Sequence, residues 1–157
     1  IPPASVDPTI KNYHWLDLVQ GIFEAYDNEA ENVVLSDGSG NVTEGPGYNI
    51  FAVEGGRIHT PEKGVLEGIT RRTALELAQE IGLETLVAPL SAEKLRRAEE
   101  VFITSTAGGI MPVTKINGEA VREGTLGEVT RALQELYWAK HADPQWTTPV
   151  DYEATGR

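Results

Sequence analysis

The sequence predicts an α/β domain in which a mixed sheet, built largely from hairpins, carries packed helices. Three observations lead to this fold class. Short β-branched and aromatic runs bounded by glycine-rich turns alternate with amphipathic helical segments along the chain. The pattern contains no internal repeat and no linker before about residue 143. With 157 residues, the chain is long enough to form one domain with a sizeable hydrophobic core.

The first helix is predicted by apolar residues spaced three and four apart. These residues share one helical face and are Trp15, Leu18, Val19, Ile22, Phe23 and Tyr26. The β-branched segment at residues 9–11, just before this helix, has the composition of a strand end. Residues 33–44 are then predicted to form two short strands around a turn rich in Asp, Gly and Asn. Residues 48–60 repeat this design, with Gly55 and Gly56 at the tip.

The second half of the chain alternates helices and strands. Apolar spacing predicts a helix over residues 66–82 that ends at Gly82 and whose inner face comprises Ala74, Leu77, Ala78 and Ile81. Residues 91–98 form a predicted short helix with Ser91 as its N-cap. The remaining predicted segments are a strand at 84–90, a buried strand at 99–106, a hairpin at 110–121 turning at Asn117-Gly118, a helix at 125–142 with Val129, Leu133, Leu136 and Tyr137 inward, and an irregular tail from 143.

Composition excludes several classes of function. The net charge of −11, from 13 Lys and Arg against 24 Asp and Glu, argues against nucleic acid as a partner. The absence of cysteine excludes disulfides and thiolate chemistry, and the three histidines show no metal-ligand spacing, so no metal is expected. The chain has no apolar run of membrane-spanning length and opens without a secretory signal, so we expect a cytoplasmic protein. It also opens without Met, as a processed or truncated piece would.

Two segments carry the donors that an anion requires. In the first, Gly68 precedes a helix start, so the backbone amides of Ile69 and Thr70 are free in the first turn and the Thr70 hydroxyl adds a donor. In the second, at residues 104–109, three hydroxyl side chains and two glycines end a buried strand. Taken alone, each segment is also explained by an ordinary helix cap or an ordinary turn.

A carboxylate and a lysine complete the set of candidates. Glu44 lies at a strand end and is followed by Gly45, Pro46 and Gly47, whose glycines permit a close backbone approach. Lys11 is one of five lysines and lies just before the first predicted helix. A solvated hairpin glutamate and a solvated lysine are the alternatives.

Together these segments resemble the fold-type IV pyridoxal-phosphate enzymes, and they occur in that family's order. "IKNYHWLDL" is similar to the segment that carries the cofactor lysine, and "LSDGSGNVTEGPGYNIF" to the segment whose glutamate pairs with the pyridine nitrogen. "TPEKGVLEGITRR" is similar to the phosphate-binding helix start, and "VFITSTAGGIMPVTKINGEAV" to the last cofactor loop and its hairpin. The resemblance implies that residues 1–143 are the large C-terminal, cofactor-binding domain of this fold, with a tail at 144–157 and the family's small N-terminal domain absent from this chain.

The resemblance implies a role for each candidate residue. Lys11 would form the Schiff base with pyridoxal 5′-phosphate and move a proton at the substrate carbon, and Glu44 would keep the pyridine nitrogen protonated. The other implied cofactor contacts are Leu66 on the ring face and Ile69, Thr70 and Thr106 at the phosphate. The implied substrate contacts are Trp15, Thr106, Ala107 and Gly108. Arg71 and Arg72 follow the phosphate site and are expected on a solvated helix face, with added charge at the phosphate site as the alternative.

Within the family, the closest likeness is to the (R)-selective amine transaminases and is carried by "KNYHWLDL" and "TAGGIMP". This likeness implies transfer of an amino group from an (R)-configured primary amine to a keto acid such as pyruvate. The alternatives are a branched-chain or D-amino-acid aminotransferase, an aminodeoxychorismate lyase, or a non-catalytic fragment. The resemblance also implies a homodimer, and full activity only together with the N-terminal half.

Overall fold

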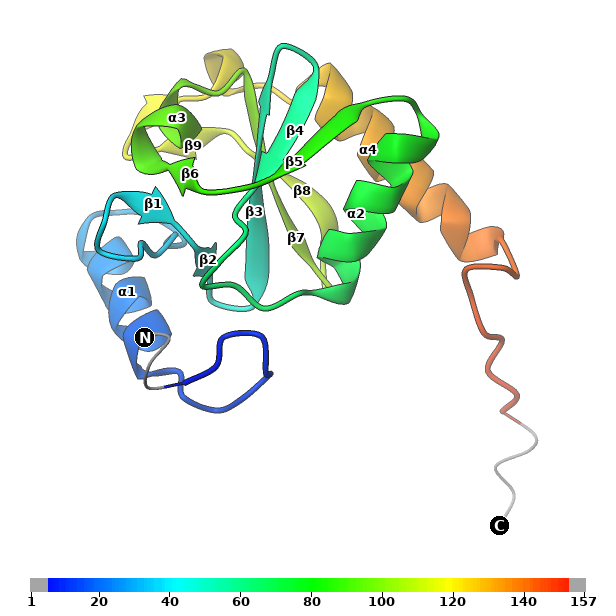
Figure 1. The fold of residues 1–157 in the computed structure, drawn as a ribbon, viewed down its shortest axis with the longest axis horizontal. Helices are drawn as coiled ribbons and strands as arrows, with labels where there is room; N and C mark the ends of the chain where they lie inside the picture. Colours follow the sequence, from blue (N-terminus) through cyan, green and yellow to red (C-terminus); the bar gives the residue numbers. More distant parts are fainter. Residues whose placement is uncertain (1–5, 153–157) are drawn as a thin grey trace.

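The fold is built around a mixed β-sheet whose strands come from the middle of the chain (Figure 1). In this computed structural model, which describes residues 6–152, the strand order is β5-β4-β3-β7-β8. These strands span Glu84–Val87 (β5), Arg57–Thr60 (β4), Tyr48–Glu54 (β3), Glu100–Ser105 (β7) and Gly109–Val113 (β8). β4 and β5 are parallel, the other pairs on this path are antiparallel, and β2 (Glu44–Gly45) adds to β3. The predicted fold class is confirmed.

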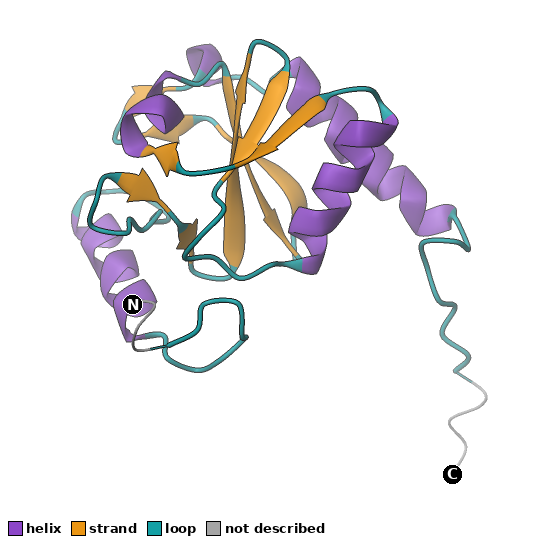
Figure 2. Ribbon diagram, in the orientation of Figure 1, coloured by secondary structure: helices purple, strands orange, loops and turns teal. Residues whose placement is uncertain are grey.

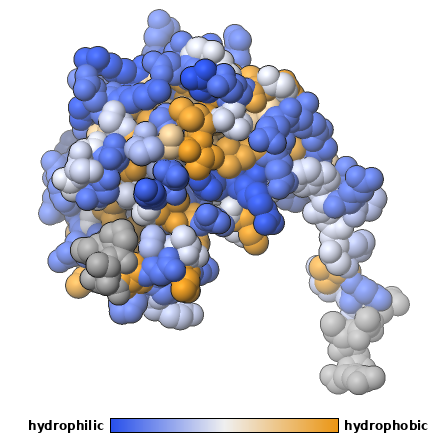
Figure 3. Space-filling model, in the orientation of Figure 1, coloured by the Kyte–Doolittle hydropathy of each residue, from blue (hydrophilic) through white to orange (hydrophobic). Residues whose placement is uncertain are grey.

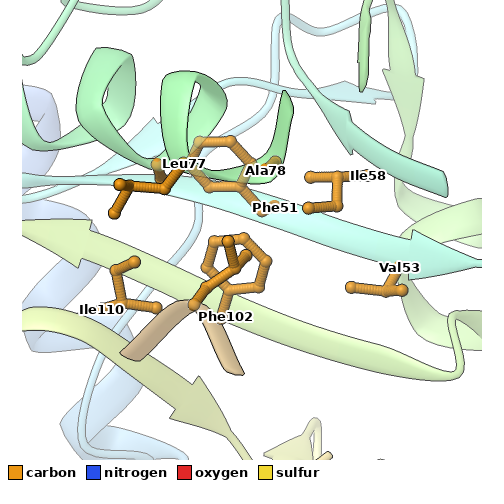
Figure 4. Packing of buried hydrophobic residues seen from close by; sticks show 9 residues of the cluster. Phe51, Val53, Ile58, Leu77, Ala78, Phe102 and Ile110 are labelled. Atoms are coloured by element: carbon orange, nitrogen blue, oxygen red, sulfur yellow. The ribbon is translucent and has the colours of Figure 1, made fainter. Parts of the chain in front are cut away.

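Two helices, α2 (Ile69–Glu80) and α4 (Glu128–Ala139), pack on one face of the sheet (Figure 2). The rings of Phe51 and Phe102 stack at the centre of this layer, with their centroids 4.6 Å apart (Figure 4). The same buried cluster contains Val53, Ile58, Ala74, Leu77, Ala78, Ile110 and Leu133. The predicted inner faces of both helices are therefore found in the core, except for Ile81, which follows the end of α2 and is 43% exposed.

The opposite face carries smaller elements. α3 (Ala92–Arg97) begins at Ser91, whose hydroxyl accepts a hydrogen bond from the Lys94 amide at 3.1 Å, as predicted. Because side chains alternate along β3, Ile50 and Ala52 face this second layer, opposite to Phe51 and Val53. Its buried cluster contains Val42, Ile50, Ala52, Leu90, Leu95, Ala98, Val101 and Val121. β3 is thus buried on both faces.

Short ladders and turns complete the fold. The predicted Asn117-Gly118 turn joins β9 (Lys115–Ile116) to β10 (Glu119–Ala120), and both turn residues have positive φ, at 51° and 81°. One-turn 3₁₀ segments lie at Arg122–Gly124 and Lys140–Ala142. Residues 143–152 contain no helix or strand and lead away from the body of the molecule (Figure 1).

One predicted strand segment is wrong, and a second forms only in part. Residues 9–11 lie in a turn and loop, not at the end of a strand. Residues 33–44 turn back on themselves as predicted, with backbone hydrogen bonds from the Leu35 amide to the Glu44 carbonyl at 3.0 Å, from the Thr43 amide to the Leu35 carbonyl at 2.9 Å and from the Asp37 amide to the Asn41 carbonyl at 3.0 Å. The first arm is not a regular strand, because it adds only a single bridge between Ser36 and Val42. The second arm contains β1 (Asn41–Val42), which also pairs with β6 (Leu90–Ser91), about fifty residues further along the chain. A partner this distant in sequence leaves no local signal.

The first helix, α1 (Leu16–Asp27), forms where predicted but buries a different face. Its buried residues are Gly21 and Ala25, and a β-carbon at Gly21 would lie 2.9 Å from Leu35 Cδ2. The apolar side chains at the surface include Phe23, 61% exposed, and Tyr26, 60% exposed. Apolar colour accordingly reaches the surface at the lower left, where α1 and the segment before it lie (Figure 3). In residues 6–152 no helix is both long and apolar enough to cross a membrane.

Candidate functional site

A cavity of about 800 Å³ lies at the end of the sheet where β3 begins, β7 ends and α2 begins. Its walls come from the segment that leads into α1, the loop at residues 35–38, the turn around β2, the loop before α2, and the turn after β7. Figure 1 shows the segment before α1 passing below this edge of the sheet. Elements distant in sequence thus share one concave site.

The cavity brings together seven of the nine residues singled out from the sequence. The seven are Lys11, Trp15, Glu44, Leu66, Ile69, Thr70 and Thr106. Ala107 and Gly108 lie in the turn that follows Thr106 and are not among the lining residues. The Gly108 amide donates to Ser105 Oγ at 3.0 Å, so this expected substrate donor is already engaged.

Glu44 is held by one of its two carboxylate oxygens. Its Oε2 accepts hydrogen bonds from the Leu66 amide at 2.8 Å and from Asn49 Nδ2 at 3.2 Å. Asn49 Nδ2 also donates to the Leu66 carbonyl at 2.8 Å, so one side chain ties the carboxylate to the loop before α2. No hydrogen bond to Oε1 occurs among residues 6–152, so this oxygen is available to a ligand in the cavity.

Burial raises the pKa of the Glu44 carboxyl above its ordinary value, because a charge is disfavoured away from water. The Leu66 hydrogen bond and the positive charges of Lys11 and Arg71 lower the pKa, but they do not offset the burial. Glu44 therefore holds a proton more readily than a solvated glutamate would. Such a group suits a proton shared with a ring nitrogen.

The turn after Glu44 is shaped by Tyr48. A β-carbon at Gly45 would collide with the Tyr48 ring, and Gly47 has a positive φ of 82°. The Tyr48 hydroxyl donates to the Val33 carbonyl, and burial raises the pKa of Tyr48 to about 12. The two glycines therefore let the chain fold around the ring and carry Glu44 to the cavity.

The start of α2 presents free backbone donors to the same cavity. Gly68 is the N-cap and supplies no side-chain cap, and the first helical bond runs from the Arg72 amide to the Gly68 carbonyl at 3.0 Å. The amides of Ile69 and Thr70 make no backbone hydrogen bond within residues 6–152. A β-carbon at Gly68 would lie 2.5 Å from Asn49 Oδ1, so the close approach requires glycine. An anion fits this helix start.

Arg71 does not lie on the expected solvated face but on the cavity wall, which fits the alternative of a charge beside the anion site. It is 7% exposed, and its Nη2 donates to the Pro61 carbonyl at 3.0 Å. Burial lowers the pKa of Arg71, and the charges of Glu67 and Glu44 act against this shift. Arg72 does lie at the surface as predicted, 3.8 Å from the Glu76 carboxylate.

The turn after β7 is held by close packing. A β-carbon at Gly108 would collide with Met111 Sδ. Gly109 has a positive φ of 66°, and a β-carbon there would lie 2.7 Å from Tyr137 Cε1 and 3.1 Å from Trp138 Cζ2. The two glycines of "TAGG" therefore fit the turn against Met111 of β8 and against α4.

The polar groups of this cavity fit a ligand that carries both an anion and a protonatable nitrogen. The free amides of α2 meet the anion, the open oxygen of Glu44 meets the nitrogen, and the Lys11 amine lies on the wall. Sequence reasoning missed Asn49, a buried polar residue paired with Thr104 across β3 and β7, and counted Thr104 only as one of the three hydroxyl side chains at residues 104–109. A polar residue inside a predicted strand was the signal that could have identified Asn49.

Comparison with known proteins agrees with this site. The family model described as amino-transferase class IV matches residues 1–116. A putative branched-chain-amino-acid aminotransferase of Methanocaldococcus jannaschii is 36% identical over 139 residues, which are 87% of this chain and 48% of that protein. The branched-chain-amino-acid aminotransferase of Pseudomonas aeruginosa is 33% identical over 145 residues, which are 88% of this chain and 47% of that protein. The chain spans about half the length of the curated relatives it matches.

Solved structures show the same likeness. The T.th. branched-chain amino acid aminotransferase superposes with a TM-score of 0.87 at 31% identity, covering 93% of this chain and 51% of that one. The enzyme of Escherichia coli gives a TM-score of 0.85 at 32% identity, covering 94% and 50%. The T.th. protein has also been solved with pyridoxamine 5′-phosphate and with 4-methylvaleric acid.

Proposed function

Because this chain belongs to the class IV aminotransferase family, we propose that it forms the cofactor-binding half of a pyridoxal-5′-phosphate-dependent aminotransferase. One observation carries the proposal: a single cavity is lined by Lys11, by Glu44 and by the uncapped start of α2. An amine, a carboxylate and an anion site are the three groups that this cofactor needs.

When bound, pyridoxal phosphate supplies an aldehyde that takes up an amino group and a ring that accepts electrons from the substrate carbon. Lys11 is the only lysine among the lining residues in the described part of the chain, so we assign the covalent bond and the proton transfer at the substrate carbon to its Nζ. Glu44 Oε1 holds the proton at the ring nitrogen, and Asn49 fixes Oε2. Leu66 borders the ring, and the α2 amides with the Thr106 hydroxyl bind the phosphate.

We propose branched-chain α-amino acids and a keto acid as the substrates. The relatives and solved structures carry branched-chain names, and 4-methylvaleric acid in one of them is a branched-chain carboxylic acid. This support favours the branched-chain alternative over the (R)-amine interpretation, which rested on two short motifs. Trp15 lies in the cavity wall, and the Thr106–Gly108 turn adjoins it, so both remain the proposed substrate border.

The division of the whole protein is part of the proposal. Residues 1–143 would form the cofactor domain and 144–157 a tail, and a further half of the protein would complete the substrate pocket and support a homodimer. The match to about half of each relative and the apolar surface left on α1 support this division.

The assignment of Lys11 is tested by reducing the pyridoxal-phosphate-loaded protein with borohydride and mapping the labelled peptide by mass spectrometry. We expect the label on Lys11 and its loss in Lys11→Ala, which should also abolish transamination. Lys63→Ala, a change outside the cavity wall, is the matched control and should keep both the label on Lys11 and transamination. Label on any lysine other than Lys11 would overturn the assignment.

The substrate class is tested separately with a panel of donors. Valine, leucine and isoleucine are compared with D-amino acids and (R)-1-phenylethylamine, each with pyruvate and 2-oxoglutarate as acceptors. A higher kcat/KM for the branched-chain donors is expected. Preference for (R)-1-phenylethylamine would restore the amine-transaminase interpretation and leave the cofactor assignment intact.

A further inference from the structure

One buried hydroxyl on the cavity wall has no partner. Thr104 on β7 is 2% exposed, and its Oγ1 makes no hydrogen bond to any atom of residues 6–152. Thr104 is also one of the residues that line the cavity. Burying a hydroxyl without a partner is unfavourable, so a donor left in this state is expected to meet a bound molecule.

The register of the sheet places this hydroxyl beneath the start of α2. Thr104 pairs with Asn49, two positions beyond the stacked pair of Phe51 and Phe102. Because side chains alternate along a strand, Thr104 and Asn49 face the same side as the two rings, which is the side that α2 covers. Asn49 reaches the Leu66 carbonyl and closely approaches Gly68, the N-cap of α2.

Three kinds of donor therefore belong to residues that line the same cavity: the amides of Ile69 and Thr70, the Thr106 hydroxyl and the Thr104 hydroxyl. We propose that Thr104 Oγ1 donates a hydrogen bond to the phosphate group of the bound cofactor. A phosphate offers several strong acceptor oxygens, whereas Thr104 Oγ1 makes no hydrogen bond to the open oxygen of Glu44. The proposal rests on the proposed function, because it assumes a phosphorylated ligand in this cavity.

The test removes the hydroxyl while keeping the shape of the side chain. Dissociation constants for pyridoxal 5′-phosphate and for pyridoxal, which lacks the phosphate, are measured by titration for wild type, Thr104→Val and Thr104→Ser. Thr104→Val should weaken binding of the phosphorylated compound about ten- to a hundredfold, the range expected for a hydrogen bond to a charged group, and leave pyridoxal unchanged. Thr104→Ser keeps the hydroxyl and should stay close to wild type.

Thermal unfolding without cofactor supplies a second readout that a merely structural threonine would not give. Thr104→Val removes an unpaired buried hydroxyl, so its Tm should equal or exceed that of wild type. Thr60 is the matched control, because it is fully buried but its hydroxyl donates to the Ile50 carbonyl at 2.8 Å. Thr60→Val should therefore lower the Tm by about 2–4 °C.

The outcomes separate this inference from the proposed function. Equal weakening of both ligands by Thr104→Val, or no weakening of either, would overturn the phosphate contact while wild type still binds the cofactor. A lowered Tm for Thr104→Val would likewise show that the hydroxyl has a partner within the protein. Failure of wild type itself to bind pyridoxal 5′-phosphate would contradict the proposed function and this contact together.

Discussion

At the scale of single residues, the site depends on how Glu44 is buried and held. Leu66 and Asn49 satisfy one oxygen of its carboxylate, and Lys11 and Arg71 are close enough to favour its charged form. Burial is nevertheless the largest influence and raises its pKa. The protein thus carries a carboxyl group whose charge is costly until a positively charged partner occupies the cavity.

This cost predicts a pH dependence of stability in the protein without cofactor. Because the pKa of Glu44 is raised in the folded state, its stabilising contribution is fully present below the ordinary value of 4.5 and is lost as the pH rises through the folded pKa. In Glu44→Gln the side chain is a neutral amide, so it carries no charge at any pH in this range. Its free energy of unfolding relative to wild type should therefore increase between pH 4 and pH 7.

Urea unfolding at several pH values measures this difference. Glu24→Gln on the exposed side of α1 is the control and should show no such trend. A difference between Glu44→Gln and wild type that stays flat or falls with rising pH would mean that the carboxylate is fully compensated by Lys11, Arg71 and its hydrogen bonds.

Under the proposed function, Glu44→Gln with bound cofactor should transaminate about 10²–10⁴ times more slowly than wild type, because a neutral amide cannot hold the ring proton.

At the scale of elements, α4 depends on a carboxylate from another strand. Gly127, its N-cap, has no side chain, and Glu100 on β7 takes over that function. Glu100 is 5% exposed and accepts from the Val129 amide at 3.1 Å, the Thr130 amide at 2.8 Å and the Thr130 hydroxyl at 2.7 Å. A carboxylate at a helix start also meets the positive end of the helix dipole. Glu100 therefore connects the sheet to the helix that supports the turn after β7.

Removing this contact should destabilise the domain strongly. Glu100→Ala leaves two amides and a hydroxyl without their partner, and we expect a loss of about 2–4 kcal/mol in the free energy of unfolding. Glu100→Gln keeps an acceptor and should lose less, which keeps the test usable if the alanine variant does not fold. Glu99→Ala, at the exposed neighbouring position, removes only the hydrogen bond that the Gly55 amide donates to Glu99 Oε2 at 3.2 Å and should cost no more than about 1 kcal/mol. Equal effects of Glu99→Ala and Glu100→Ala would contradict the capping role.

At the scale of the whole molecule, the sequence predicted what local pattern determines and missed what distant contacts determine. Glu44, Thr70 and Thr106 were found because each lies in a short motif of glycines and donors, and Lys11 was found through the family resemblance of its segment. The fold places all four on one cavity. The β1–β6 pairing joins segments about fifty residues apart and had no local signature. Asn49 was missed, and Thr104 received no role of its own within the 104–109 segment, because their use depends on register across two strands.

The apolar face of α1 shows the same limit. Helical spacing identified the stripe correctly, yet amphipathicity says only that a face needs cover and not which surface supplies it. In this chain Gly21 and Ala25 meet the body, while Phe23 and Tyr26 stay exposed. The apolar surface of the molecule is therefore divided between a closed core over the sheet and an open stripe on α1.

The three phenylalanines of the chain test this division directly. Phe51 and Phe102 are fully buried and stacked, whereas Phe23 is 61% exposed. Phe102→Ala should lower the free energy of unfolding by about 3–5 kcal/mol, or Phe102→Leu by a smaller amount if the alanine variant does not fold. Phe23→Ala should change the free energy of unfolding by no more than about 0.5 kcal/mol.

In the isolated chain, Phe23→Ala should also reduce the binding of a hydrophobic dye such as ANS, since it removes part of the open stripe. A large loss of stability in Phe23→Ala would instead place α1 inside the folded core and leave no apolar stripe for the rest of the protein to cover.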